Sequence, residues 1–427
     1  MIVRYPLKCN GCGVITILRI AVSHRDRDPF HFECEECHRE ISGIFVTDQQ
    51  AAAVKGIEDL RGAALSETED GAKYFHLYSS DFATETSQES VTGLSPFLTA
   101  HMMLGPQFVE RMGRIAQFYG LVENDGAELK GIARQFSEGN RKQFRLSVSR
   151  YLDWPLDEPI DQQRALFQLF ELMLGPLFHS ESHVSLVSKM YSELKHLFKD
   201  KKPAFIAFVD DALVRGYLKS SRQELLDQLL RFLEEADDFR SVLPFWDAAD
   251  QNAAFPPELA VRAPRSFNQL KSFYVDLYEA VARSLTLVTA IGNLVHRGDH
   301  NAYQPHPTLR DKFAPRSMAD FHTKNSAPKL AYLADLSWLS EWVQPSMDAK
   351  LRNAIGHNSS RYNPKTGNID YQLDGAGTVR SISYGDFLFA ILRLVRTSLQ
   401  LAHLTKQLYV FDHFRGMDMS GAPGPVA

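Results

Sequence analysis

Three residues in the C-terminal part of the chain carry side chains suited to acid–base chemistry on an anion. Arg352, Asn353 and His357 lie in the stretch LRNAIGHNSSRYNPKTGNIDY. Histidine exchanges protons near neutral pH because its unperturbed pKa is about 6.5. Arginine is a permanent cation whose forked N–H donors match the oxygens of a carboxylate or phosphate. Together these residue types could transfer a proton and stabilise a developing negative charge.

The geometry of this group depends on where its helix ends. Arg352 and His357 are five positions apart, so on a straight helix their directions would differ by about 140°. Asn353 and His357 are four apart and would share a face. Gly356 is the residue type that most often ends a helix, and we expect a helix terminus there. In a purely structural alternative, Arg352 pairs with an acidic neighbour such as Asp348, Asn353 satisfies backbone groups, and His357 is buried and hydrogen-bonded.

Four cysteines form a second group, at the N-terminal end. Cys9 and Cys12 lie in CNGC, and Cys34 and Cys37 lie in CEEC. Two C-x-x-C pairs separated by about twenty residues match the spacing of four-thiolate zinc sites. Four protein ligands leave no open position, so the pattern predicts a structural zinc ion. Two disulfides are the alternative, but no secretory signal is present and the rest of the chain contains no cysteine.

A third group lies in GNLVHRGDHNAY and contains His296, Arg297, Asp299 and His300. We expect a polar loop at the end of a helix. Other interpretations are auxiliary contacts to the Arg352 site, a degenerate second copy of it, or a metal site made by the two histidines. Gly298 argues against a helix that continues through both histidines, and so against a metal pair on one face.

Length and composition restrict the class of protein. A chain of 427 residues exceeds the size of most single cores, so two or three domains are expected. A hydrophobic fraction of 44% and a charged fraction of 23% are typical of soluble globular proteins. The net charge of -5 argues against a nucleic-acid-binding surface over the whole protein, although it allows a local basic cleft. No apolar run approaches the roughly 20 residues of a membrane span, which favours a cytoplasmic protein.

Periodicity predicts a mainly α fold with a small β zinc ribbon at the N-terminus. The segment DQQAAAVKGIEDLRGAAL is rich in helix formers, and Ser221 with Glu224 form a capping-box pair at the start of a leucine-rich helix. The expected domains are a zinc ribbon over 1–48, a connecting region over 49–105, a helical domain over 106–255, a C-terminal domain over 265–415, and a flexible tail over 416–427.

The C-terminal domain is expected to be a helical bundle with a β-hairpin insertion. Long apolar stripes predict helices over 270–295 and 327–343, followed by a short helix over 346–355 that carries Arg352 and Asn353. NIDYQL and TVRSIS, joined by DGAG, predict the hairpin. Ser383 and Asp386 then predict the cap of a long final helix.

In this setting the run R-N-x-x-x-H resembles the HEPN superfamily of all-helical ribonuclease domains. The resemblance extends over roughly the last 150 residues, from Arg265 to Phe414. It implies metal-independent cleavage of RNA, in which the ribose 2′-hydroxyl attacks the adjacent phosphate. In that mechanism Arg352 stabilises the negative charge that develops on the phosphorane, His357 manages the protons, and Asn353 orients the histidine or the phosphate.

The resemblance also implies partners and a biological role. HEPN sites usually form where two such domains meet, and one copy of the motif in the chain implies a homodimer. Many HEPN nucleases act in stress responses or in antiviral defence by abortive infection. A toxin of this kind would be controlled by a phage-derived trigger or a neutralising partner, with the first 250 residues acting as sensor or restraint.

Two other functions remain open from the sequence. One is a non-catalytic, zinc-stabilised scaffold whose HEPN-like domain binds RNA or dimerises. The other is an unrelated helical enzyme that uses a metal held by His296 and His300.

Overall fold

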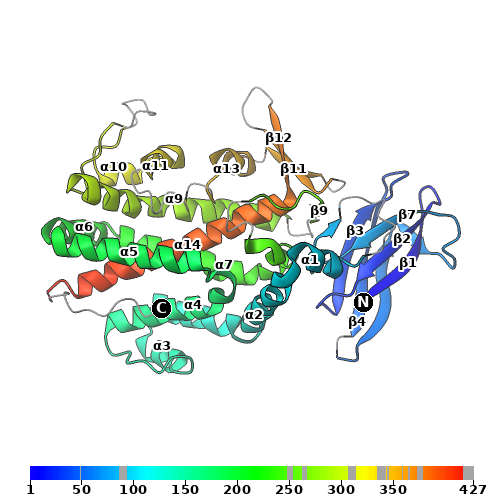
Figure 1. The fold of residues 1–427 in the computed structure, drawn as a ribbon, viewed down its shortest axis with the longest axis horizontal. Coiled ribbons are helices and arrows are strands. Elements are labelled where there is room, and N and C mark those ends of the chain that lie inside the picture. Colours follow the sequence, from blue (N-terminus) through cyan, green and yellow to red (C-terminus); the bar gives the residue numbers. More distant parts are fainter. Residues whose placement is uncertain are drawn as a thin grey trace. The chain divides into compact units, whose positions relative to one another are not determined.

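The computed structural model describes residues 1–48, 50–85, 94–247, 253–261, 267–305, 314–333, 343, 346–357, 359–363, 366–372 and 378–416. The chain divides into two compact units. The first consists of Met1–Gly113, Glu235–Ser272 and Asn353–Ala390, and the second of Arg114–Glu234, Phe273–Arg352 and Ile391–Ala427. Helices predominate, and the small sheets belong to the first unit (Figure 1), in agreement with the expected mainly α class.

Two small sheets form the N-terminal part of the first unit. One has the strand order β6-β1-β2-β7, in which β2 and β7 are parallel, and the other is an antiparallel meander of β3, β4 and β5. Fully buried and less buried residues alternate along β3, as in a strand with one face on a core. The strands are β1 (Ile2–Cys9), β2 (Ile15–Ala21), β3 (Arg27–Glu33), β4 (Glu40–Asp48), β5 (Ala53–Arg61), β6 (Ala63–Leu65) and β7 (Ala72–Tyr78).

The helix expected within DQQAAAVKGIEDLRGAAL is wrong, because this segment forms β5 and β6. Val54, Ile57 and Leu60 pack against the core of the N-terminal sheets. Gly56 and Asp59 have positive φ angles, which an α-helix does not contain. Pairing with β4 and burial of the apolar residues therefore override the helix propensity of the alanines. The strands continue past Asp48 as far as Tyr78.

The second unit is built from long helices with aromatic contacts between them. Phe232 of α7 lies 6.0 Å from both Phe118 of α2 and Phe178 of α4, measured between ring centroids. Phe411 of α14 packs against Phe198 of α5 at 5.3 Å. The helices of this unit, including those that extend into the first, are α2 (Phe108–Ser137), α3 (Arg141–Val148), α4 (Pro159–Phe178), α5 (Glu181–Asp200), α6 (Lys202–Val214), α7 (Tyr217–Glu234), α9 (Phe267–Arg297), α10 (Met318–His322), α11 (Ser326–Tyr332), α13 (Ala349–Gly356) and α14 (Tyr384–His413).

The cap expected at Ser221 is also wrong. Helix α7 begins four residues earlier, directly after Gly216, whose φ angle is 74°. Ser221 is buried inside the helix, and Glu224 forms an ion pair with Arg283 at 2.6 Å. The buried Leu218 explains the earlier start, since its side chain extends the apolar face of the helix by a further turn.

The predicted hairpin and the final helix are confirmed. Strands β11 (Asn368–Gln372) and β12 (Val379–Ser383) pair antiparallel, and β10 (Ser360–Asn363) adds a third strand. The Asp386 N–H donates to Ser383 Oγ at 3.0 Å, and the Ser383 hydroxyl donates to the Asp386 carboxylate at 2.6 Å, as the cap prediction requires. Part of the helix expected over 327–343 and most of the expected tail lie outside the described residues.

Shorter elements of the first unit are α1 (Pro96–Leu104), β8 (Thr84–Glu85), β9 (Leu259–Ala260) and the 3-10 helices Gly105–Gln107, Ala236–Phe239 and Leu243–Phe245.

Helix α14 is long and apolar enough to cross a membrane, which the sequence analysis did not expect. However, 89% of its most apolar window is buried inside the protein. Burial of this kind is typical of the core helix of a soluble protein, and the helix carries fully buried polar residues such as Arg396 and Ser398.

Two helical glycines should respond in opposite ways to alanine. A Cβ at Gly385, in the first turn of α14, would lie 2.4 Å from the ring of Phe255, whereas a Cβ at Gly120 of α2 would meet nothing within 4 Å. We expect Gly385→Ala to lower the free energy of unfolding by about 1–3 kcal/mol through overpacking. Gly120→Ala should raise it by about 0.5–1 kcal/mol through helix propensity. Urea denaturation followed by circular dichroism measures both, and equal stabilisation by the two substitutions would contradict the described packing.

Candidate functional site

Helix α13 is short and ends where the sequence predicts. Asp348 Oδ1 caps its start by accepting hydrogen bonds from the N–H groups of Lys350 and Leu351, at 2.8 and 3.0 Å. The last helical residue is Gly356. Leu351, Ala354 and Ile355 are buried, and this spacing directs one apolar face inward.

Arg352 belongs to the second unit and is half-buried there. Its guanidinium forms an ion pair with Glu279 of α9, and the two side chains are 26% and 31% exposed. The structural alternative expected an acidic partner such as Asp348, and the structure gives Arg352 an acidic partner in Glu279. The ion pair holds the arginine in place and neutralises part of its charge in the free protein.

Other charged residues of the second unit surround this pair. Arg283 is paired with Glu224 at 2.6 Å. Lys329 is almost fully buried and donates from Nζ to the carbonyl oxygen of His322 at 3.0 Å. Burial, together with the nearby Arg283, lowers the pKa of Lys329 to about 8, against the opposing effect of Glu279 and Glu224. With Lys329 protonated, the group formed by Glu224, Glu279, Arg283, Lys329 and Arg352 carries one excess positive charge.

Asn353 and His357 belong to the first unit and are both exposed. The His357 N–H donates to the carbonyl oxygen of Asn353 at 2.9 Å, so His357 follows the last helical turn directly. Ser359 then caps the helix end, with its N–H and hydroxyl donating to the carbonyl oxygen of Ala354 at 2.9 and 3.0 Å. The alternative of a buried His357 is therefore wrong, and its imidazole is open to solvent.

The third group, around His296, Arg297 and His300, is a polar helix end. Helix α9 stops at Arg297, and Gly298 has a φ angle of 77°, as the glycine predicted. His296 is exposed, whereas His300 is buried against Phe208 with its Nε2 3.4 Å from a carboxylate oxygen of Asp211. The groups of clustered metal ligands found among the described residues do not include His296 and His300.

The same group lies far from Arg352 within one chain. His296 follows Glu279, the partner of Arg352, by seventeen residues on α9, which is about 26 Å along an α-helix. The structure therefore does not bring His296, Arg297 and His300 to Arg352 in one chain. A contact of these residues with RNA stays a prediction.

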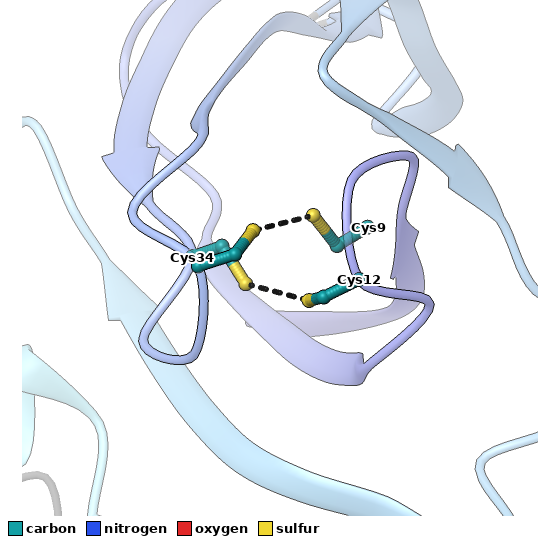
Figure 2. A group of neighbouring side chains, drawn as sticks. Cys9, Cys12 and Cys34 are labelled. Carbon is teal, nitrogen blue, oxygen red and sulfur yellow. Dashed lines mark hydrogen bonds between the residues drawn. The ribbon is translucent and has the colours of Figure 1, made fainter.

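The four cysteines are brought together by the two N-terminal sheets. Figure 2 shows Cys9 and Cys12, from one turn, pointing toward Cys34. The sulfur atoms of Cys9 and Cys37 are 3.5 Å apart and those of Cys12 and Cys34 are 3.6 Å apart, so no disulfide joins them. All four sulfur atoms lie within 4.8 Å of one another. Four sulfurs at about 2.3 Å from one tetrahedral ion are about 3.8 Å apart, so the cluster could hold a metal ion.

Local structure favours the thiolate form in one of these cysteines. Burial raises the pKa of Cys9, but hydrogen bonds with the backbone N–H groups of Cys12 and Gly11 and with the side chains of Cys37 and Cys34 together more than offset this and bring the pKa to about 7. Cys9 and Cys34 are buried in the core of the N-terminal sheets, while Cys12 and Cys37 are exposed.

A fourth group of residues with ligand side chains was missed by the sequence analysis. Ligand atoms of Glu171, His179 and His183 lie within 4.8 Å of one another in the second unit. His403 of α14 also contacts the Glu171 carboxylate through its Nε2. The only local signal is the spacing of the two histidines in HSESHVS, because Glu171 is eight residues earlier and His403 is 232 residues from Glu171.

Comparison with known proteins gives no match for this chain, whether to family models, to curated proteins or to solved structures.

The charge of Lys329 should make stability depend on pH. Its pKa is about 8 in the folded protein and 10.5 in the unfolded chain, so between these values the unfolded chain binds more protons and stability rises with pH. We expect Lys329→Met to be more stable than the native protein near pH 7, by up to about 3 kcal/mol, with the difference shrinking toward pH 10. Urea denaturation at several pH values measures this, with Lys350→Met, at an exposed position of α13, as the control. A difference that does not change with pH would contradict the prediction.

Proposed function

We propose that the chain is a metal-independent endoribonuclease of HEPN type. The observation that carries the proposal is the end of α13: the helix stops at Gly356, and an exposed His357 follows the turn that contains Arg352 and Asn353. A histidine open to solvent is accessible to a large substrate such as RNA. The arginine is already oriented by Glu279.

Each residue has a defined part in the proposed reaction. The 2′-hydroxyl of the ribose attacks the adjacent phosphorus while its proton passes to a base, and the bond to the 5′-oxygen breaks as that oxygen takes up a proton. His357 carries these protons, because a ring nitrogen of imidazole can both accept and donate one. Arg352 stabilises the extra negative charge on the phosphate oxygens, and Asn353 donates a hydrogen bond that orients the imidazole or the phosphate. The products are a 2′,3′-cyclic phosphate and a 5′-hydroxyl.

The rest of the proposal concerns assembly and regulation. HEPN sites are built by two domains, so a chain with one motif is proposed to act as a homodimer. The role proposed is RNA cleavage in the cytoplasm during stress or anti-phage defence. The N-terminal sheets and the central helices, which are not needed for the chemistry, would respond to a trigger or to a neutralising partner.

We further propose that the four cysteines bind a structural zinc ion. Sulfur ligands, the tight C-x-x-C turns and the sulfur separations of 3.5 and 3.6 Å support zinc. Because Cys9 and Cys34 are part of the hydrophobic core of the N-terminal sheets, binding of the ion and folding of these sheets would be coupled.

Loss of a cysteine should therefore remove zinc and loosen the N-terminal strands. We expect Cys34→Ser to lose one zinc per chain and residues 1–78 to become sensitive to protease. Elemental analysis and limited proteolysis measure the two effects. His31→Gln, at a half-exposed position of β3 beside Glu40, is the control and should keep its zinc. A Cys34→Ser protein that keeps the native zinc content would contradict the proposed zinc site.

The proposed nuclease activity is tested by substituting motif residues and examining cellular RNA. Cells expressing the native protein, before and during phage infection, should accumulate new RNA ends bearing 2′,3′-cyclic phosphate. Arg352→Ala and His357→Ala should reduce these ends by at least about 100-fold, in line with the loss of general acid–base catalysis. Arg361→Ala and His413→Ala, at exposed positions outside the motif, serve as matched controls.

One outcome would favour the non-catalytic alternative. The ion pair of Arg352 with Glu279 is equally compatible with a structural role for the arginine. Intact RNA in infected cells, together with RNA binding or dimerisation that survives His357→Ala, would contradict the nuclease and support this alternative.

A further inference from the structure

The turn between α4 and α5 places three ligand side chains together. Glu171 lies on α4, His179 follows its last residue, and His183 lies in the first turn of α5. The His179 N–H donates to the carbonyl oxygen of Gly175, which closes α4. Ser180 caps α5 by accepting from the His183 N–H at 3.2 Å. Two well-formed helix ends therefore fix the relative positions of these side chains.

A fourth ligand side chain comes from a distant part of the chain. His403, in the middle of α14, contacts one oxygen of Glu171, and His179 contacts the other. The ring of His183 lies 5.4 Å from that of His179 and 6.0 Å from that of His403, measured between centroids. Helices α4, α5 and α14 thus converge on one carboxylate and three imidazoles, all within the second unit (Figure 1).

The group is buried except on one side. Glu171, His183 and His403 are 8%, 2% and 5% exposed, whereas the His179 side chain is 46% exposed. A small ion could therefore reach the group past His179 without unfolding of the helices.

Hydrogen bonding within the group does not account for all of its polar atoms. His179 and His403 each contact one oxygen of the Glu171 carboxylate. His183 makes no described hydrogen bond to this carboxylate. His183 Nδ1 is buried and has no hydrogen-bond partner among the described residues. A buried polar atom without a partner costs about 1–3 kcal/mol and calls for an explanation. A bound ion supplies one, since neutral imidazole nitrogen is a common metal ligand.

We propose that Glu171, His179 and His183 bind one divalent transition-metal ion of zinc type, while His403 holds the Glu171 carboxylate in position. Carboxylate and histidine side chains that project inward from facing helices are an established way to build a metal site in a helical bundle. Imidazole suits zinc and its neighbours in the first transition row, whereas calcium and magnesium require mainly oxygen ligands.

Two cations near the site further favour zinc over magnesium and calcium. Arg396 acts on His183 and Lys406 acts on Glu171, and both cations oppose a bound ion. Magnesium and calcium bind chiefly through charge and would be rejected. Zinc and cobalt form stronger bonds to nitrogen and would be retained. The ion would link α4 to α5, and α14 would contact the site through His403 and Glu171.

The experiment measures metal binding by the full-length protein, independently of any nuclease activity. Cys12→Ser with Cys37→Ser removes the cysteine site, and this protein, freed of metal by a chelator, is titrated with Zn²⁺, Co²⁺ and Mg²⁺. We expect it to take up one Zn²⁺ per chain, to melt at a higher temperature with Zn²⁺ bound, and to show no response to Mg²⁺. With Co²⁺ it should give visible bands without the thiolate charge-transfer band of a cysteine site.

Variants at the site identify the ligands. In the same background, His183→Gln should weaken Zn²⁺ binding by at least about 100-fold. His403→Gln, which removes a partner of the Glu171 carboxylate, should weaken it by about 10–100-fold. His196→Gln, at an exposed position on the same helix as His183, is the control and should bind normally. The proposal is overturned if the background protein takes up no Zn²⁺, or if the two variants bind it as tightly as the control.

The native protein provides a second measurement in case the double cysteine variant does not fold. It should hold two zinc ions per chain, and His183→Gln with His403→Gln should hold one. A native protein that holds a single zinc ion, loses it in Cys34→Ser and keeps it in His183→Gln with His403→Gln would overturn the proposal.

Discussion

Burial of α14 is the constraint on which most of this structure depends. The helix is 30 residues long, and nearly all of it is enclosed by protein, although it carries arginine, threonine, serine, glutamine and histidine side chains. Polar groups that are removed from water must find partners elsewhere in the fold. Thr397 accordingly donates to Ser346 Oγ at 3.2 Å, and His403 contacts Glu171. At the start of the helix, Asp386 accepts from the Phe255 N–H at 2.7 Å as well as completing the cap.

The elements that could be predicted from the sequence are those whose signals are local and repeated. The long helices show apolar stripes over many turns, and the cap at Ser383 and the hairpin after α13 follow from a few adjacent residues. The two errors have a common cause. Both the segment that forms β5 and the start of α7 are decided by contacts with distant residues, which here outweigh alanine propensity and the capping pattern at Ser221.

The candidate sites show the same difference between local signals in the sequence and contacts with distant residues. The cysteine pairs lie close in the sequence and have a specific spacing, so their proximity could be predicted. The end of α13 at Gly356 was also predictable, since glycine acts locally. Glu279, which holds Arg352, is 73 residues earlier on another helix, and no pattern in the sequence links the two. Likewise Glu171 and His403 meet only because α4 and α14 pack together.

The pair between Arg352 and Glu279 also bears on which anions this part of the protein can attract. An arginine that already has a carboxylate partner gains little from a single phosphate, since that phosphate must compete with a charge that is permanently attached nearby. A polymer is different, because each further phosphate adds to the local potential and releases counterions that favour binding. If the chain acts on RNA as proposed, this pair would favour long strands over mononucleotides and inorganic phosphate, and binding would weaken steeply as salt is added.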